Sequence, residues 1–95
     1  MSAVGELDLT TAPVLEERLL GELRAGHDVE LDLSAVPFVD SSGLRTLVQA
    51  VRVSAEHDVS FRLLEPIPTQ MRRVLEVTGL IERLPIAPAP VAPEA

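Results

Sequence analysis

Apolar and polar residues follow a strand-like pattern along three short stretches of the chain. From Val29 to Leu33 the apolar residues are separated by single acidic ones, and a period of two is typical of a strand with one buried face. Val4 to Leu9 and Val59 to Leu64 are further short stretches rich in apolar residues. The pattern therefore predicts three strands, and the first of them leads into a helix.

Three other stretches repeat apolar residues at helical spacing. Thr10 or Thr11 is expected to cap the first helix with its hydroxyl, and Gly26 is expected to end it. The third helix is expected to begin near Pro68 and to end at Gly79, since glycine tolerates the left-handed conformation of a helix end. The inner faces predicted from this spacing are Leu15, Leu19 and Leu23 in the first helix; Leu44, Leu47, Val48, Val51 and Ala55 in the second; and Met71, Val74, Leu75 and Thr78 in the third.

The alternation of strand and helix, three times over, favours an α/β domain whose sheet has parallel members covered by helices. Residues Ile81 to Ile86 are expected to add a short last strand or a docked extension. One domain is predicted over residues 1–84. Residues 85–95 carry four of the eight prolines, so they are predicted to form a flexible Pro/Ala-rich tail without a core of its own.

Composition narrows the classes of function. The 95 residues suffice for one domain, and the absence of Trp and Tyr predicts an aliphatic core. The absence of Cys excludes thiolate chemistry and cysteine-ligated metals. A formal net charge of -7 argues against nucleic-acid binding, which needs a basic surface. No apolar run is long enough to insert into a membrane, and the start of the chain lacks a signal peptide, so a cytoplasmic protein is predicted.

The polar segment Asp40-Ser41-Ser42-Gly43 follows an apolar stretch and opens the second helix. Unpaired amides at a helix start attract anions, so a phosphate would find donors there. Phosphorylation of a serine in this segment would add about 1.5 to 2 negative charges and would weaken an interface that covers it. The same residues are also a good capping sequence. The segment is therefore either a charge switch or only a helix cap.

Four short segments, spread over most of the chain, together form a sequence pattern. They are Gly5-Glu6-Leu7-Asp8, Leu31-Asp32-Leu33-Ser34, Phe38-Val39-Asp40-Ser41-Ser42-Gly43-Leu44 and Leu75-Glu76-Val77-Thr78-Gly79-Leu80. In this order they resemble the STAS family, and in particular the bacterial anti-anti-sigma factors. The resemblance runs from Gly5 to Leu84, and it implies an α/β fold with a small mixed sheet flanked by helices.

The resemblance implies a regulatory binding module that is not an enzyme and has no cofactor or metal. The serine directly after the motif aspartate, here Ser41, would be phosphorylated by a partner that is both an anti-sigma factor and a serine kinase. The unphosphorylated form would bind that partner and free the sigma factor, and a phosphatase would reset the switch. Asp40 would help to position Ser41, and Asp8 would lie on the same contact surface. The partner-binding set is completed by Ser42, Gly43 and Leu44.

The start of the chain departs from that family, because only Met1 to Val4 precede the Gly-Glu-Leu-Asp segment. The usual first strand is therefore expected to be shortened or missing. A missing strand would leave unpaired backbone donors and acceptors at a sheet edge. This predicts a homodimer or strand exchange through that edge.

Three alternative interpretations remain open. A constitutive assembly module of a transporter or another multiprotein complex would use the same fold, with Ser41 as only a helix cap. A hydrolase would need His27 or His57 beside Ser41, although the segment lacks the Gly-x-Ser-x-Gly of a nucleophile elbow. The pair Arg72 and Arg73 is interpreted as a solvated helix face or as partner contacts.

Overall fold

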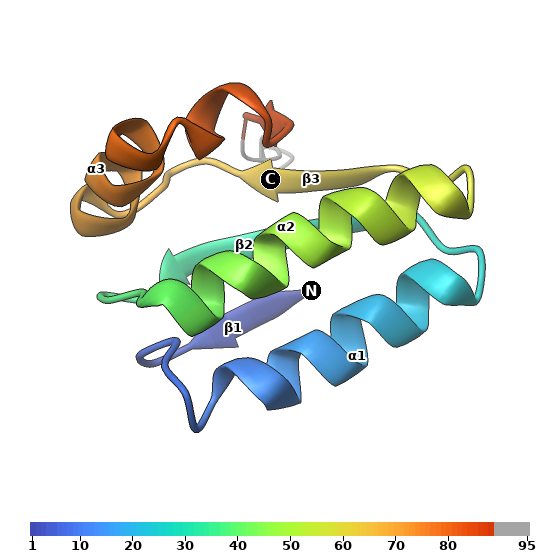
Figure 1. The fold of residues 1–95 in the computed structure, drawn as a ribbon, viewed down its shortest axis with the longest axis horizontal. Helices are drawn as coiled ribbons and strands as arrows, with labels where there is room; N and C mark the ends of the chain where they lie inside the picture. The colour runs from blue at the N-terminus through green and yellow to red at the C-terminus, as the bar shows by residue number, and fades with distance from the viewer. Residues whose placement is uncertain (89–95) are drawn as a thin grey trace, which may run out of the picture.

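Strands and helices alternate along the chain in the computed structural model, which describes residues 1–88 (Figure 1). The order of the predicted strands and helices, and the α/β class, are confirmed. The elements are β1 (Ser2–Val4), α1 (Ala12–Arg24), β2 (Val29–Ala35), α2 (Ser41–Glu56), β3 (Phe61–Leu64), α3 (Thr69–Thr78), the short 3₁₀ helix η1 (Leu80–Glu82) and β4 (Ile86–Ala87).

The four strands form one sheet in the order β1-β2-β3-β4, and every neighbouring pair is parallel. The expectation of a mixed sheet is corrected on this point: within residues 1–88 the sheet is parallel throughout. The reason is that each connection passes through a helix, which carries the chain back to the end of the sheet where the previous strand began.

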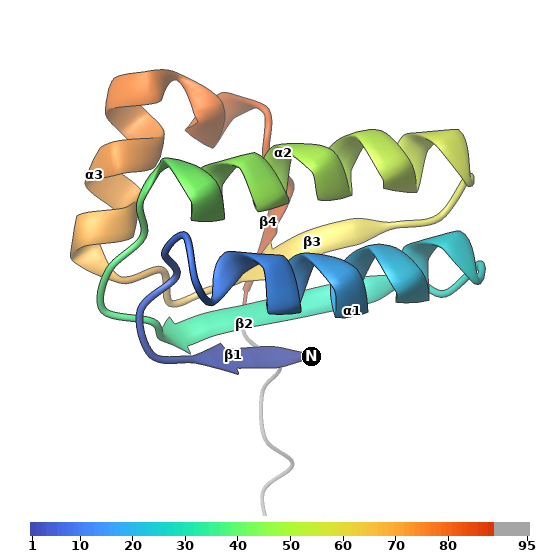
Figure 2. The same cartoon turned by 60° about the horizontal axis from the view of Figure 1, so that its bottom comes forward.

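Figure 2 shows α1 and α2 side by side over one face of this sheet. In β2, Val29, Leu31 and Leu33 are buried beneath the helices. Glu30 between them is exposed on the other face, where its Oε2 lies 4.0 Å from Nη2 of Arg62 on β3. The alternation of apolar and acidic residues therefore predicted both the strand and its buried face correctly.

The core between sheet and helices is aliphatic, as the composition predicts. Phe61 is buried at the start of β3, whereas Phe38 is 43% exposed. Met71 and Leu75 confirm the predicted inner face of α3, although Thr78 at its end is exposed. The largest fully buried side chains are Leu19, Leu23, Leu31, Leu47, Leu63, Met71, Leu75, Val36, Val39 and Thr46.

The buried face of α2 is not the one that the apolar spacing predicts. Leu47 is fully buried, but Leu44 and Val51 are half-buried, Val48 is 43% exposed and Ala55 is exposed. Short side chains fill most of the inner face, because α1 and the sheet approach α2 closely there. Leu44 and Val51 pack at the margin of the core, and Val48 is left on the outer flank of the helix. The buried residues of α2 are Gly43, Thr46, Leu47, Ala50, Val53 and Ser54.

The N-terminal strand lies earlier in the chain than predicted, since β1 covers Ser2–Val4 and shares only Val4 with the predicted strand from Val4 to Leu9. β1 ends at Val4, and the chain turns at Gly5, whose φ of 86° lies in the region that glycine tolerates. Leu7 makes a single parallel bridge with Val39 instead of continuing the strand. The predicted threonine cap is wrong: Thr11 precedes α1 without a side-chain capping bond, because its hydroxyl bonds within the preceding turn. Only the three residues of β1 form a strand before this turn, and whether the usual first strand of the family is shortened or missing stays a prediction.

The start of the predicted tail belongs to the sheet. The amide of Leu63 donates to the carbonyl of Pro85 at 2.8 Å, and the amide of Glu65 donates to the carbonyl of Ala87 at 2.9 Å. A proline can accept such bonds although it cannot donate them. The predicted domain boundary after residue 84 is therefore corrected to include β4. Residues 89–95 of the predicted tail lie outside the described residues.

Candidate functional site

Asp40 caps the first turn of α2. Its backbone is extended (φ -107°, ψ -171°), and its Oδ1 accepts hydrogen bonds from the amides of Ser42 and Gly43 at 2.8 and 3.3 Å. A cap of this kind stabilises a helix by about 1 kcal/mol. The capping role of the segment falls to Asp40, so the interpretation of Ser41 as only a helix cap is wrong.

Ser41 is the first residue of α2, and it is exposed. Because Asp40 makes the capping bonds, the start of the helix does not depend on the Ser41 hydroxyl. Ser42 beside it is half-buried, and its carbonyl accepts a hydrogen bond from Oγ1 of Thr46 at 3.3 Å. Of the two adjacent serines, Ser41 is the one that solvent or a partner reaches more easily.

Gly43 holds the start of α2 against the neighbouring loop. A Cβ at this buried position would collide with Cγ2 of Val39, and it would lie 3.0 Å from Cβ and 3.2 Å from the carbonyl oxygen of Leu7. Glycine is therefore required by the close approach of two backbone segments. This contact fixes where Ser41 stands relative to the sheet.

Backbone hydrogen bonds join the loop of Asp40 to the loop of Asp8. The amide of Leu7 donates to the carbonyl of Phe38 at 2.9 Å, and the amide of Asp40 donates to the carbonyl of Leu7 at 3.0 Å. The two loops thus lie together at one end of the sheet. The structure brings together the residues that the resemblance groups on one surface, and partner binding by that surface stays a prediction.

Asp8 shapes the turn before α1. Its Oδ1 accepts from the amides of Thr10 and Thr11 at 3.0 and 3.1 Å. The hydrogen bonds from the Thr11 amide and then from the Thr10 amide hold the pKa of the Asp8 carboxyl below its ordinary value of 3.8. The Asp8 side chain is therefore a fixed negative charge at neutral pH, beside the loop of Asp40.

Gln70 on α3 braces the same loop, and sequence reasoning missed it. Its Oε1 accepts a hydrogen bond from the amide of Val39 at 3.1 Å, and its Nε2 donates one to the carbonyl oxygen of Val39 at 3.4 Å. The two residues are 31 positions apart, so no local pattern relates them. The contact ties α3 to the segment that precedes Ser41.

Exposed apolar side chains lie in the two joined loops. Leu9 is 78% exposed and Phe38 is 43% exposed, and Leu44 on the first turn of α2 is half-buried. Apolar side chains exposed beside polar groups are typical of surfaces that bind proteins. We call the surface of Leu9, Phe38, Asp40 and Ser41 the switch surface.

Both histidines lie far from Ser41. His57 follows the end of α2, so about 24 Å of helix separate it from Ser41. His27 follows α1, which runs in the same direction as α2 (Figure 2), and its Nδ1 lies 2.7 Å from Oε2 of Glu22. A Ser-His-Asp arrangement is therefore not formed around Ser41.

Residues 1–88 bring no three metal-ligating side chains together. None of the helices described is long and apolar enough to cross a bilayer. On α3, Arg72 is half-buried and Arg73 is exposed. Their positions fit a solvated helix face, and a partner contact there stays a prediction.

Comparison with known proteins places this site in context. A family model described as STAS domain matches residues 1–91. The anti-sigma-B factor antagonist of Bacillus subtilis is 30% identical over 87 residues, which are 92% of this chain and 79% of that protein.

Solved structures are similar as well. An anti-sigma factor antagonist from Mycobacterium paratuberculosis is 31% identical, with a TM-score of 0.77 over 90% of this chain and 72% of that one. The phosphorylated form of SpoIIAA, a Bacillus cell fate determinant, is 24% identical, with a TM-score of 0.67 over 94% of this chain and 79% of its own. The second likeness shows the fold alone.

Proposed function

Because the chain belongs to the STAS domain family, we propose that it acts as an anti-sigma factor antagonist in the cytoplasm. Its unphosphorylated form binds an anti-sigma factor that is also a serine kinase, and the sigma factor is thereby released. Phosphorylation of Ser41 by that kinase switches the binding off, and a phosphatase resets the switch. The chain is a binding partner and a substrate in this cycle, and it is not an enzyme.

The observation that carries the proposal is the division of roles at the start of α2. Asp40 makes the capping bonds, whereas the adjacent Ser41 is exposed. Ser41 can therefore carry a phosphate without losing the helix start. The phosphate would be favoured by the helix N-terminus and disfavoured by the Asp40 carboxylate. The folded state tolerates the modification, and its charge acts at the surface.

The exposed apolar side chains of the switch surface explain how that charge breaks an interface. In this proposal the partner covers Ser41 together with the exposed Leu9 and Phe38, and it removes water from the serine. A phosphate carrying about 1.5 to 2 negative charges would then lose hydration. The phosphate would also repel any acidic group of the partner, in addition to the repulsion that the Asp8 carboxylate exerts in both states. An unmodified serine carries neither cost.

A phosphorylation assay tests the proposal. The purified chain is incubated with ATP and each anti-sigma factor kinase of its source organism, and intact masses and peptide maps are recorded. We expect one phosphate, on the peptide that contains Ser41, and none on Ser41→Ala. Ser42→Ala is the matched control and should be modified like the wild type. A phosphate on Ser42, or none from kinases that modify other antagonists, would contradict the proposal.

Binding measurements separate this function from a constitutive assembly module. Ser41→Ala should bind the kinase like the unmodified wild type, and Ser41→Asp should bind more weakly. Equal binding by both variants, together with co-purification of an ATP-binding transporter subunit, would favour the assembly module.

A second proposal concerns β1, which lies at the edge of the sheet. We infer that β1 of one 95-residue chain pairs with β1 of a second copy. Ser2 and Val4 lie opposite Asp32 and Ala35 of β2. The hydrogen bonds to β2 are made by their chain neighbours: the Met1 carbonyl accepts from Asp32, and the Gly5 amide donates to Ala35. Their own amides and carbonyls therefore point away from β2. Two antiparallel copies would pair Ser2 of one chain with Val4 of the other through these groups.

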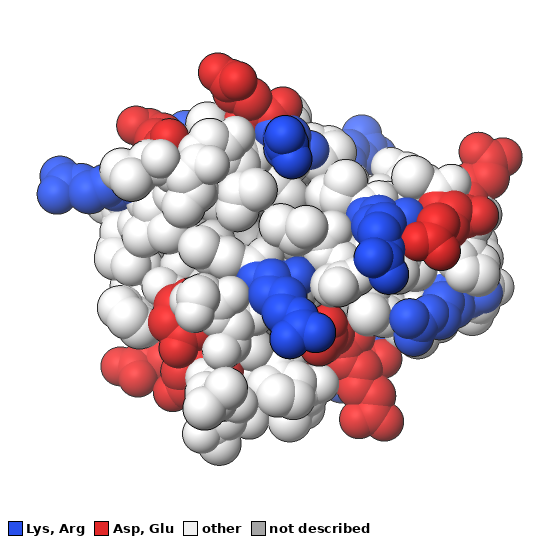
Figure 3. Space-filling model, in the orientation of Figure 1, with Lys and Arg blue, Asp and Glu red and all other residues white. Residues whose placement is uncertain are grey.

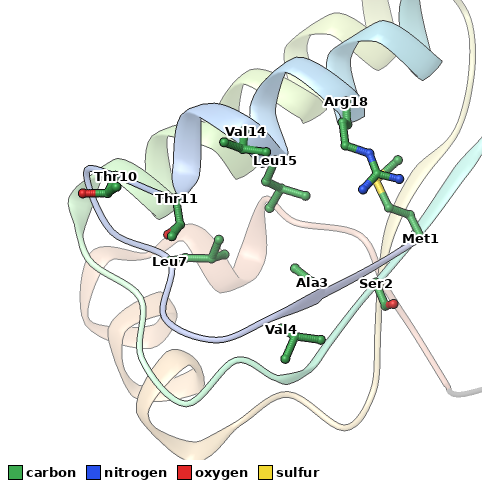
Figure 4. A pocket seen from close by; sticks show the side chains of 10 residues that line it. All are labelled: Met1, Ser2, Ala3, Val4, Leu7, Thr10, Thr11, Val14, Leu15 and Arg18. Carbon is green, nitrogen blue, oxygen red and sulfur yellow. The ribbon is translucent and has the colours of Figure 1, made fainter.

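A groove beside the same edge would be covered in that dimer. It has a volume of about 470 Å³ and lies between β1 and α1, with Ala3, Val4 and Val14 among its lining residues (Figure 4). Light scattering of the wild type should give the mass of a dimer, and Val4→Pro, which removes an outward amide, should give a monomer. A wild-type monomer at high micromolar concentration would rule the pairing out.

A further inference from the structure

A small pocket lies beside the outer flank of α2, next to Val48. The pocket lies between α2 and η1 and has a volume of about 190 Å³. Its wall is largely apolar, with two guanidinium groups among the lining side chains. The lining residues are Val48, Val51, Arg52, Leu80, Arg83 and Leu84.

The pocket and the switch surface lie on one line along α2. Positions 41, 45, 48 and 52 are spaced so that they share one face of a helix, and all four residues are exposed. At 1.5 Å per residue, Val48 lies about 10 Å and Arg52 about 16 Å from Ser41 along the helix axis. A segment that docks at Ser41 and follows α2 therefore reaches the pocket.

The surroundings of the pocket are basic although the chain as a whole is acidic. Arg45, Arg52 and Arg83 stand around Val48, whereas the net charge of the chain is -7. Glu56 offsets part of this charge, since its Oε1 lies 3.2 Å from Nε of Arg52. Figure 3, which views the α2 face, shows several basic groups across the middle of this face, with acidic groups beside some of them.

The volume and the lining indicate the kind of occupant. Small-molecule sites usually measure roughly 300–1,000 Å³, so a pocket of about 190 Å³ suits a single side chain better than a cofactor. Protein interfaces place apolar anchors in such pockets and surround them with polar groups. A guanidinium pairs best with a carboxylate, through two parallel hydrogen bonds. The complementary occupant is an apolar side chain with carboxylates beside it.

We propose that this pocket receives an apolar side chain from an acidic segment of the anti-sigma factor that binds at Ser41. The identity of that partner rests on the proposed function. Val48 contributes the apolar contact, and Arg52 and Arg83 select carboxylates. Partners would thus be distinguished at the pocket, whereas phosphorylation acts at the other end of the same helix face.

A peptide titration tests the chemistry of the pocket without the partner. The ¹⁵N-labelled full chain is titrated with acetyl-Glu-Glu-Leu-Leu-Glu-Glu-amide while amide chemical shifts are recorded. We expect saturable shifts around Val48 and Leu84. The peptide with Gln in place of Glu should bind about tenfold more weakly or worse. Equal binding of the two peptides, shifts centred elsewhere, or no shifts at millimolar peptide would overturn the proposal.

Charge reversal identifies the groups that select the peptide. Arg83→Glu should weaken binding of the acidic peptide by about tenfold or more. Arg24→Glu is the matched control, because Arg24 is exposed at the end of α1 and does not line the pocket. An equal loss in both variants would mean that only net charge matters, and the pocket would lose its role.

The partner itself separates this inference from the proposed function. Val48→Asn should weaken binding of the kinase by about tenfold, whereas Val77→Asn, at a valine of α3 that is 82% exposed and does not line the pocket, should not. If a kinase phosphorylates Ser41 and binds Val48→Asn normally, the pocket inference fails and the proposed function stands. If no kinase modifies Ser41 but the peptide binds the pocket, the partner assignment is overturned.

Discussion

The inner and outer faces of α2 differ in the size of their side chains, since most of the buried positions on the inner face carry short residues. The inner face carries short residues such as Gly43, Ala50 and Ser54, because α1 and the Leu7 loop come close to it. The outer face carries Leu44 and Val48, which residues 1–88 leave half-buried or exposed. The contrast teaches that apolar spacing in a helix does not by itself point to the core. On this helix it points to the core at Leu47, to the margin of the core at Leu44 and Val51, and to the surface at Val48.

The largest expected effect separates Leu47 from its neighbour Val48. Leu47→Ala should lower the free energy of unfolding by about 2–5 kcal/mol, since Leu47 is fully buried and a cavity would remain. Val48→Ala should change it by less than about 0.5 kcal/mol, because the side chain is 43% exposed. Urea denaturation measures both values. Similar losses in the two variants would break the distinction between the faces.

Two helical glycines should respond to alanine with opposite signs. Gly43→Ala should cost about 1–3 kcal/mol of stability, since the new Cβ would press against Val39 and Leu7. Gly21→Ala in α1 should stabilise the protein by up to about 1 kcal/mol, because nothing lies within 4 Å of its Cβ position. Thermal denaturation of both variants is the measurement. A stabilising Gly43→Ala would show that the contact at the start of α2 is not tight.

Substitutions of the capping Asp40 and of the adjacent Ser41 should also differ in their effect on the free energy of unfolding. Asp40→Ala should cost about 1 kcal/mol through the two lost hydrogen bonds, and Asp40→Asn should retain most of that stability. Ser41→Ala should lie within about 0.5 kcal/mol of the wild type. Denaturant midpoints give the comparison. A cost for Ser41→Ala as large as that for Asp40→Ala would return the capping role to Ser41.

The smallest expected effect is the contribution of the Asp8 turn to the loss of stability in acid. The pKa of Asp8 is lowered in the folded state from its ordinary value of 3.8, so the carboxylate contributes stability that is fully present above that value. That contribution is lost as the pH falls through the lower folded-state pKa. Asp8→Asn should therefore lose slightly less stability than the wild type as the pH falls below about 4. Parallel pH curves for wild type and variant would mean that the amide bonds to Asp8 are not formed in solution.

Local patterns predicted most of the fold. The alternation in β2 and the four-residue spacing of Leu15, Leu19 and Leu23 predicted a strand and a helix together with their buried faces. The helix start at Asp40 was visible because capping depends on residues within one turn. These features rest on interactions between near neighbours, which the order of residues encodes directly.

Long-range contacts decided what the patterns could not. The bridge between Leu7 and Val39, the brace from Gln70 and the pairing of β4 with β3 join residues far apart in the sequence. Each depends on backbone groups or on a single amide side chain, which leave no periodic signal. The inner face of α2 is of the same kind, since the approach of α1 and the sheet determines which side chains fit.

The sequence by itself determined the order of strands and helices, an aliphatic core and an Asp-Ser-Ser-Gly segment at a helix start. Only the tertiary structure decided that Asp40 caps while Ser41 is exposed, and that the Asp8 loop lies beside them. It also decided that Val48 faces outward towards a pocket lined by Arg52 and Arg83. The physical reason is that burial depends on how closely packed elements approach one another, and that distance is set by the whole fold.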